Sequence, residues 1–247
     1  MTTVRQYKKN PLPKPTELSR IKPLDYYLDI AKKVNPKLNI EKGFDCYSPF
    51  VVNCQRCVVT YEMRRRGLKV KAKPVYYWQE KKDIISNGTN RAWVDPDTGF
   101  IPDFKNIPPI KDKTQAINEI RDFISEKYPV GKKRVFTLQW GRTNTDMGEP
   151  RAGHVVIVQE INGQLYFIDP QTGESAEKRL ANEFETNMVK IDSLKFLRID
   201  NKKINKAYNA KIYQNENKKY NMFLTKISSI LKKQNRPIPN RTDMILD

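Results

Sequence analysis

The chain has 247 residues, and its 46 lysines and arginines outnumber its 28 acidic residues to give a formal net charge of +18. This length suits one well-packed domain with extensions, and the positive charge favours an anionic partner such as nucleic acid or an acidic protein. No apolar run reaches the roughly 18 residues that a membrane-spanning helix needs, and no apolar segment follows the basic N-terminus. We therefore expect neither a membrane span nor a Sec signal peptide.

The cysteines and the histidine limit the available chemistry. The three cysteines, Cys46, Cys54 and Cys57, are an odd and sparse set. Such a set argues against a disulfide framework and for free thiols in a reducing compartment. His154 is the single histidine, so any chemistry that needs an imidazole depends on it.

Composition divides the chain into three expected regions. A basic N-terminal arm and helix occupy residues 1–40, a central domain occupies 41–200, and a basic tail occupies 201–247. Helical spacing that ends at a proline predicts a helix over 25–36. In the tail, the apolar residues of 220–233 recur at helical spacing and predict an amphipathic helix. Residues 1–24 are interpreted as an arm that lies extended over a surface or is mobile, and the tail is interpreted as a solvated helix or docking arm.

A second helix is predicted over 54–66, because Asn53 is a preferred N-cap residue and Gly67 suits the position after a helix end. Cys54 would then occupy the first helical position, where unpaired N–H groups and the helix dipole favour a thiolate. Cys57 lies one turn deeper among apolar residues. We interpret Cys57 as a buried structural thiol, with a role as the nucleophile left open.

The next segments predict the remaining framework of the central domain. The run of arginines at 64–66 is interpreted as a solvated helix end that complements the dipole. Residues 70–78 predict a strand, and residues 79–112, rich in Asn, Asp, Gly and Pro, predict a long surface loop. Apolar residues at helical spacing predict a helix over 113–128.

Three strands follow, over residues 134–140, 153–161 and 164–170. Asn162-Gly163 joins the last two, and this dipeptide is typical of a two-residue type I′ hairpin turn. The turn sets the register of the hairpin so that Ile161 faces Gln164.

In that register His154 lies opposite Gln171, and Asp169 lies opposite Val156. Because side chains alternate along a strand, His154, Asp169 and Gln171 project from the same sheet face. We expect the Nδ1–H of His154 to donate to the Asp169 carboxylate. That bond would leave Nε2 free to take a proton from a thiol.

A cysteine at a helix N-terminus, followed by His and Asp on adjacent strands, is the arrangement of papain-like enzymes. The motifs NCQRCVVTYEMRRRGLKVKAKP, GHVVIV and YFIDPQTG resemble the papain-fold toxin family of the Tox-PL type, which includes bacterial effectors that deamidate glutamine in host proteins. The resemblance covers residues 44–180. It implies an α+β papain-like fold with the nucleophile helix packed against an antiparallel sheet. It also implies Cys54 as nucleophile, His154 as general base and Asp169 as the third member.

The oxyanion donors are less certain from sequence. Ser48 stands where papain-like enzymes carry an oxyanion glutamine. Asn53 is a candidate donor provided that its side chain does not cap the helix, and Gln171, in the DPQ of the family pattern, either is structural or touches the substrate. The resemblance implies no metal and no cofactor.

The resemblance implies a cysteine hydrolase, most simply a protein glutamine deamidase that converts Gln to Glu in a target protein. Relatives are toxins, effectors or phage components, so the chain is expected in the cytoplasm or a virion, or delivered into a target cell. A cysteine protease or a transglutaminase would use the same triad. A non-catalytic phage structural protein of this fold could instead bind nucleic acid or an acidic partner through its positive charge.

Two other interpretations of the cysteine pair remain open. A zinc site would have to combine the pair with Cys46 and His154, and a helical pair of this spacing is geometrically awkward for zinc. A redox pair would leave the histidine unexplained.

Overall fold

The computed structural model describes residues 22–38, 48–75, 88–128, 134–143, 153–207 and 212–215. The basic arm before residue 22, Cys46 and the helix predicted over 220–233 lie outside the described residues. The chain divides into two units, Met1–Gln214 and Asn215–Asp247. Apart from Asn215, every described residue belongs to the first unit. Within this described part, no helix is both long and apolar enough to cross a membrane.

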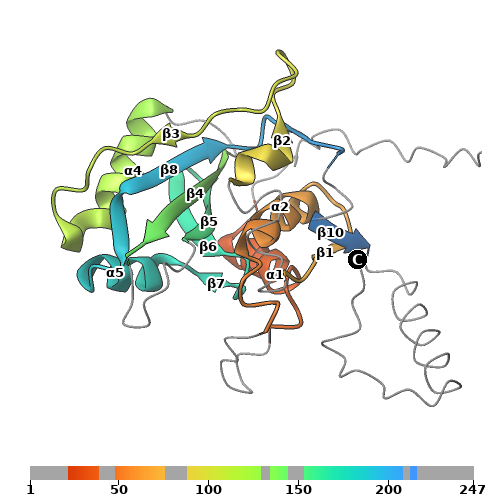
Figure 1. The fold of residues 1–247 in the computed structure, drawn as a ribbon, viewed down its shortest axis with the longest axis horizontal. Helices are drawn as coiled ribbons and strands as arrows, with labels where there is room; N and C mark the ends of the chain where they lie inside the picture. Colours follow the sequence, from red (N-terminus) through yellow and green to blue (C-terminus); the bar gives the residue numbers. More distant parts are fainter. Residues whose placement is uncertain are drawn as a thin grey trace, which may run out of the picture. The chain divides into compact units, whose positions relative to one another are not determined.

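An antiparallel sheet of six strands lies at the centre of the first unit, in the order β3-β8-β4-β5-β6-β7 (Figure 1). Its strands are β3 Lys105–Asn106, β4 Val135–Arg142, β5 His154–Ile161, β6 Gln164–Asp169, β7 Glu174–Ser175 and β8 Val189–Arg198. Two short strand pairs accompany it: β1 Val70–Ala72 with β10 Tyr213–Asn215, and β2 Trp93–Val94 with β9 Lys203–Ile204.

Helices cover both faces of the sheet, with α1 and α2 on one face and α4 and α5 on the other (Figure 1). Their bounds are α1 Leu24–Lys32, α2 Cys54–Arg65, α4 Ala116–Lys127 and α5 Glu177–Glu185, with short 3₁₀ helices at Thr89–Ala92 and Lys113–Gln115. Strand β5 is buried along its whole length. Its alternate residues therefore supply both cores: Val155 and Ile157 the core with α1 and α2, and Val156 and Val158 the core with α4 and α5. The α+β papain-like architecture expected from the sequence is confirmed.

The β5–β6 hairpin has the predicted turn and register. Asn162 and Gly163 both have positive φ, at +53° and +84°, as a type I′ turn requires. Ile161 pairs with Gln164, and the register continues to the pair Ile157 and Ile168. This register carries the ends of β5 and β6, where His154 and Asp169 lie, to the same edge of the hairpin.

The helix predicted over 54–66 is confirmed as α2, with Asn53 as its N-cap residue. Gly67 follows the helix with φ +94°, in the left-handed region that glycine adopts without strain. The helix predicted over 113–128 is present as a 3₁₀ turn followed by α4.

The arginines at the end of α2 are not solvated, so that prediction is wrong. Arg65 and Arg66 bind the buried carboxylate of Glu62 at 2.6 and 2.7 Å, and their side chains are only 10% and 9% exposed. Arg66 also donates to the main-chain carbonyls of Ile199 and Lys202. These charges tie the end of α2 to the chain that follows β8.

Two other segments differ from the sequence-based expectation. The strand predicted over 70–78 is limited to Val70–Ala72 within the described residues. The segment predicted as a surface loop buries Thr89, Ala92 and Trp93 completely. Helix α5 and strand β8 were not predicted at all, although β8 pairs with β4 at the centre of the sheet.

Candidate active site

Cys54 and His154 line one pocket of about 230 Å³. Cys54 begins α2 and is partly exposed, and His154 begins β5. Strand β4 contributes Gln139 and Trp140 to the same pocket, and β8 contributes Ser193 and Lys195. The N-terminus of one helix therefore faces three neighbouring strands of the central sheet.

His154 and Asp169 form a buried hydrogen-bonded pair. Nε2 of His154 lies 2.9 Å from Oδ2 of Asp169, and the two residues are only 3% and 1% exposed. The predicted contact is present, but the predicted nitrogen is wrong: Nε2, and not Nδ1, binds the carboxylate. Since the rotation of the ring decides which nitrogen faces the carboxylate, strand register alone does not determine it.

The second ring nitrogen of His154 is left for Cys54. Cys54 and His154 line the same pocket, and with Nε2 held by Asp169 the ring nitrogen that remains for Cys54 is Nδ1. Burial disfavours the imidazolium, but the charge and hydrogen bond of Asp169, followed by Cys54, outweigh it and raise the pKa of His154 to about 9. His154 is therefore an imidazolium at neutral pH, and its positive charge lies in the same pocket as the Cys54 sulfur.

Strand β4 fixes the ring of His154 from the other side. The indole of Trp140 meets the imidazole edge to face, with ring centroids 5.3 Å apart. Trp140 is itself held, because its Nε1–H donates to Glu183 at 2.9 Å. Gly153 allows the close approach of β4 and β5, since a Cβ there would lie 1.8 Å from the Trp140 carbonyl oxygen.

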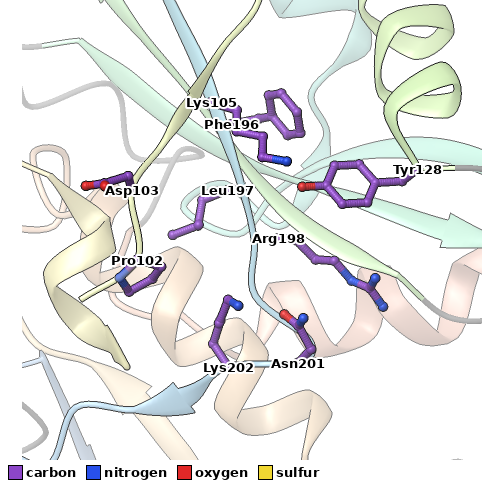
Figure 2. Close-up of a pocket in the computed structure, with 9 residues that line it drawn as sticks. All are labelled: Pro102, Asp103, Lys105, Tyr128, Phe196, Leu197, Arg198, Asn201 and Lys202. Atoms are coloured by element: carbon purple, nitrogen blue, oxygen red, sulfur yellow. The ribbon is translucent and has the colours of Figure 1, made fainter. Parts of the chain in front are cut away.

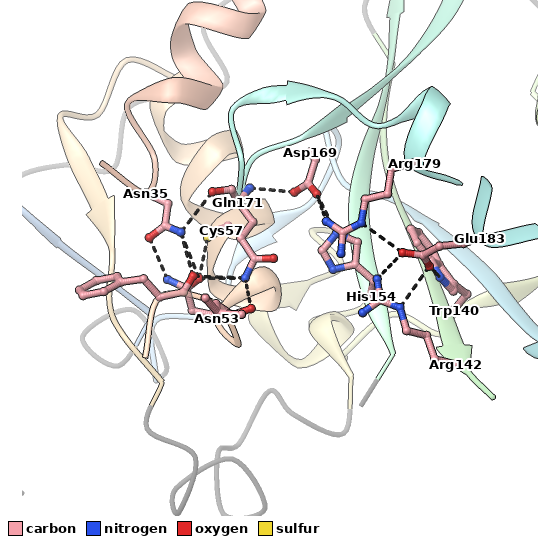
Figure 3. A network of polar contacts seen from close by, with 12 residues as sticks. Asn35, Asn53, Cys57, Trp140, Arg142, His154, Asp169, Gln171, Arg179 and Glu183 are labelled. Carbon is pink, nitrogen blue, oxygen red and sulfur yellow. Dashed lines mark hydrogen bonds and ion pairs between the residues drawn. The ribbon is translucent and has the colours of Figure 1, made fainter. Parts of the chain in front are cut away.

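Arginines and a glutamate surround the outer side of the Asp169 carboxylate (Figure 3). Arg179 donates to Oδ2 of Asp169 at 3.0 Å and also to Glu183, which in turn accepts from Arg142. Burial alone would raise the pKa of Asp169, but the charge and hydrogen bond of His154, followed by the charge of Arg179, lower it. Asp169 is therefore a carboxylate at neutral pH.

Three buried amides lie on the inner side of Asp169 (Figure 3). The main-chain N–H of Gln171 donates to Oδ1 of Asp169 at 2.9 Å. The side-chain amide of Gln171 donates to the carbonyl of Val51 at 2.6 Å and to Oδ1 of Asn53 at 3.3 Å. Asn35 completes this amide cluster by donating to Gln171 O at 3.2 Å. The cluster of Asn35, Asn53 and Gln171 thus connects Asp169 to the residues that precede Cys54.

Asn53 does not cap α2 with its side chain. The amide of Asn53 nevertheless stays inside the protein, because Nδ2 donates to Asn35 Oδ1 at 3.2 Å and to Lys73 O at 3.3 Å. Both of its N–H groups are spent, which leaves none for an oxyanion. The N–H of Cys54, at the first helical position, has no acceptor within the helix.

Cys57 differs from Cys54 in burial and partners. It is completely buried, and its thiol donates to Asn53 Oδ1 at 3.3 Å. Burial, followed by the negative charges of Cys54 and Asp169, raises the pKa of the Cys57 thiol well above its usual value. Cys57 is therefore a neutral thiol in the core at neutral pH.

A second pocket of about 220 Å³ lies between β3, the end of β8 and Tyr128 (Figure 2). It contains neither cysteine nor histidine, and two of its cations are already neutralised. Lys202 pairs with Asp95 at 2.5 Å, and Arg198 pairs with Asp200 at 2.9 Å. None of its lining residues is a cysteine, serine, threonine or histidine, so it lacks the pairing of a nucleophile with a histidine that the first pocket has.

Several residues of the site were not predicted from the sequence, namely Asn35, Trp140, Arg179 and Glu183. They come from three places in the chain, namely the turn after α1, strand β4 and helix α5. Arg179 and Glu183 lie one turn apart on α5, but no spacing along the chain brings the three segments together. Over the ranges that the structure describes, no group of three or more His, Cys, Asp and Glu could hold a metal ion.

The chain matches one protein family over residues 52–174, and that family is described as papain fold toxin 1, glutamine deamidase. No curated protein and no solved structure is significantly similar to the chain. The matched residues include the N-terminus of α2, the β5–β6 hairpin and all of Cys54, His154 and Asp169. Through these residues, the chain belongs to the papain-fold toxin family of glutamine deamidases.

Proposed function

We propose that the protein is a cysteine amidohydrolase that converts a glutamine of a target protein to glutamate. The observation that carries this proposal is that Cys54 and His154 share one pocket and that His154 is hydrogen-bonded to the buried Asp169, in the order of a nucleophile, a proton carrier and an orienting carboxylate. The family description supports the same reaction.

The proposed reaction begins with a thiolate and an imidazolium. The Cys54 sulfur attacks the carbon of the glutamine carboxamide, and the resulting oxyanion accepts from the main-chain N–H of Cys54. The Nδ1–H of His154 then protonates the departing nitrogen, which leaves as ammonia. The acyl group remains bound to Cys54 as a thioester. A water molecule gives a proton to Nδ1 and attacks the thioester. Collapse of this second intermediate expels the Cys54 thiolate and leaves His154 as an imidazolium, and the proton of the new carboxyl group passes to ammonia to give glutamate and ammonium.

The size of the pocket supports a side chain as the reacting group. Sites that enclose drug-sized ligands usually measure about 300–1,000 Å³, whereas this pocket measures about 230 Å³. A single glutamine side chain, presented by a larger molecule, is the substrate that suits it. The amide cluster would then position Cys54 and Asp169 without touching the substrate.

The proposal is tested by incubating a host-cell lysate with the protein and mapping modified glutamines by mass spectrometry. We expect glutamine residues in which the amide NH₂ is replaced by OH, together with released ammonia. Cys54→Ala should abolish both signals. Cys57→Ser is the matched control, and it should retain activity because the buried thiol takes no part in the chemistry.

Other products would identify a different reaction at the same site. Cleaved target chains would indicate a protease, and attachment of an added primary amine to glutamine would indicate a transglutaminase. A Cys54→Ala variant that still releases ammonia would contradict the proposal.

A further inference from the structure

We propose that Lys195 and Gln139 form a carboxylate-binding subsite beside Cys54, which selects target glutamines that have an acidic side chain next to them. This inference rests on the proposed function. Both residues line the pocket that contains Cys54 and His154. They are also direct neighbours across strands β4 and β8. Opposed residues of an antiparallel pair have Cβ atoms about 4.5–5.5 Å apart, so one ligand group can reach both side chains.

Both side chains have donors that the protein leaves unused. The ammonium of Lys195 lies over the Phe104 ring, 4.8 Å from its centroid, and no carboxylate of the described residues pairs with it. The carbonyl oxygen of Gln139 accepts from the Thr89 hydroxyl at 3.4 Å, which turns the amide NH₂ away from Thr89. An ammonium and an amide NH₂ are donors only, so both need an acceptor, and the uncompensated positive charge of Lys195 favours an acceptor that is a carboxylate.

The rest of the pocket does not provide that acceptor. None of its lining residues is an aspartate or a glutamate. The Ser193 hydroxyl is already spent, because it accepts from Gly141 N at 2.6 Å and donates to Lys190 O at 2.5 Å. In the pocket of Figure 2, by contrast, carboxylates of the protein neutralise Lys202 and Arg198. The pocket that contains Cys54 therefore combines an ammonium with a lining that has no carboxylate, whereas Asp103 is among the residues that line the pocket of Figure 2.

The position of Cys54 indicates which molecule carries the carboxylate that binds Lys195. A ligand group at Lys195 shares its pocket with the group that reacts at Cys54. One protein chain fills both positions when an aspartate or glutamate stands next to the reacting glutamine. The positive charge of the whole protein adds attraction for such an acidic segment.

The test compares ammonia release from three matched peptides, in which glutamate, leucine or lysine flanks one glutamine on both sides. The wild-type protein should prefer the glutamate peptide to the lysine peptide by about tenfold or more in kcat/KM, as expected for a hydrogen bond to a charged group. Lys195→Met should remove most of this preference, and Lys195→Glu should reverse it. Lys190→Glu, an equal charge change at an exposed position of the same strand, should retain the wild-type ranking.

A second readout separates this inference from the proposed reaction. The same peptides are tested for protection of Cys54 from iodoacetamide. Charge-selective protection that depends on Lys195, without ammonia release, would support the subsite and contradict the deamidase. Ammonia release with an unchanged ranking in Lys195→Glu would overturn the subsite and leave the deamidase intact. Absence of charge selectivity in both readouts would also overturn the subsite.

Discussion

The two oxygens of the Asp169 carboxylate are held by two different kinds of surroundings. Oδ1 faces the amide cluster, in which neutral, buried groups of Asn35, Asn53 and Gln171 bind one another and the main chain. Oδ2 faces charged groups, namely His154 and the side chain of Arg179, which is 39% exposed. The neutral side connects Asp169 to the chain around Cys54, whereas the charged side sets which protons the site holds. We infer that position and charge are controlled from opposite sides of one carboxylate.

Removal of the Asp169 charge should reduce activity most, because Asp169 contacts both the amide cluster and the charged groups. Asp169→Asn keeps the shape but no longer stabilises the imidazolium or orients His154. Activity measured as ammonia release should fall by about 10³ to 10⁴-fold, as for the aspartate of other catalytic triads. Circular dichroism should show an intact fold. A loss of less than about tenfold in a folded variant would mean that Asp169 does not orient the histidine.

The charged side also makes stability depend on pH. The pKa of His154 is raised from 6.5 to about 9 in the folded protein, so folding favours the protonated form. This contribution is complete below the unfolded value and is lost as the pH rises through the folded value, and a shift of this size corresponds to about 3 kcal/mol. Urea unfolding should show that the wild type and His154→Gln differ in their free energy of unfolding, and that this difference shrinks as the pH rises from 6.5 to above 9. A difference that is independent of pH would contradict the assignment.

On the neutral side, Gln171→Ala should have a smaller but distinct effect. The substitution removes the donor to the Val51 carbonyl and one of the donors to Asn53 Oδ1, which costs about 1–3 kcal/mol of stability. The Asp169 carboxylate keeps its charge, but Asp169 and Cys54 lose part of their support and are less precisely positioned. We therefore expect kcat to fall by about 10- to 100-fold with little change in KM. Gln171→Glu, which adds a charge but removes the donor, should not restore activity. Full activity in Gln171→Ala would show that the amide cluster does not position the site.

Arg179→Gln should have the smallest effect of these changes. Arg179 binds Asp169, but its side chain is 39% exposed, and exposed ion pairs contribute little. We expect a two- to threefold change in kcat, roughly, and a stability change of less than about 1 kcal/mol. If Arg179→Gln lost as much activity as Asp169→Asn, Arg179 and not the amide cluster would be the group that positions Asp169.

Local signals predicted the part of the site that depends on neighbouring residues. The N-cap and C′ residues located α2 and Cys54 at its start, and Asn162-Gly163 fixed the register that brings His154 to Asp169. Both are determined within a few residues of the chain, where turn and cap preferences act directly.

Long-range packing determined what the sequence did not predict. The choice of Nε2 over Nδ1 depends on the Trp140 ring and on Glu183, which binds its indole. The amide cluster joins Asn35 to Gln171, two residues that are far apart in the sequence. Strand β8 pairs with β4 through a bulge after Gln139, and only tertiary contacts reveal that β8 borders the site.

The most direct test of the account is the rate of iodoacetamide labelling at each cysteine as a function of pH, mapped by peptide mass in wild type and His154→Ala. Cys54, which is partly exposed and shares its pocket with the His154 imidazolium, should be labelled rapidly at neutral pH, and His154→Ala should slow the labelling strongly. Cys57, completely buried, should resist labelling until the protein unfolds. Equal rates at Cys54 and Cys57, or a Cys54 rate that does not change in His154→Ala, would contradict a thiolate paired with His154.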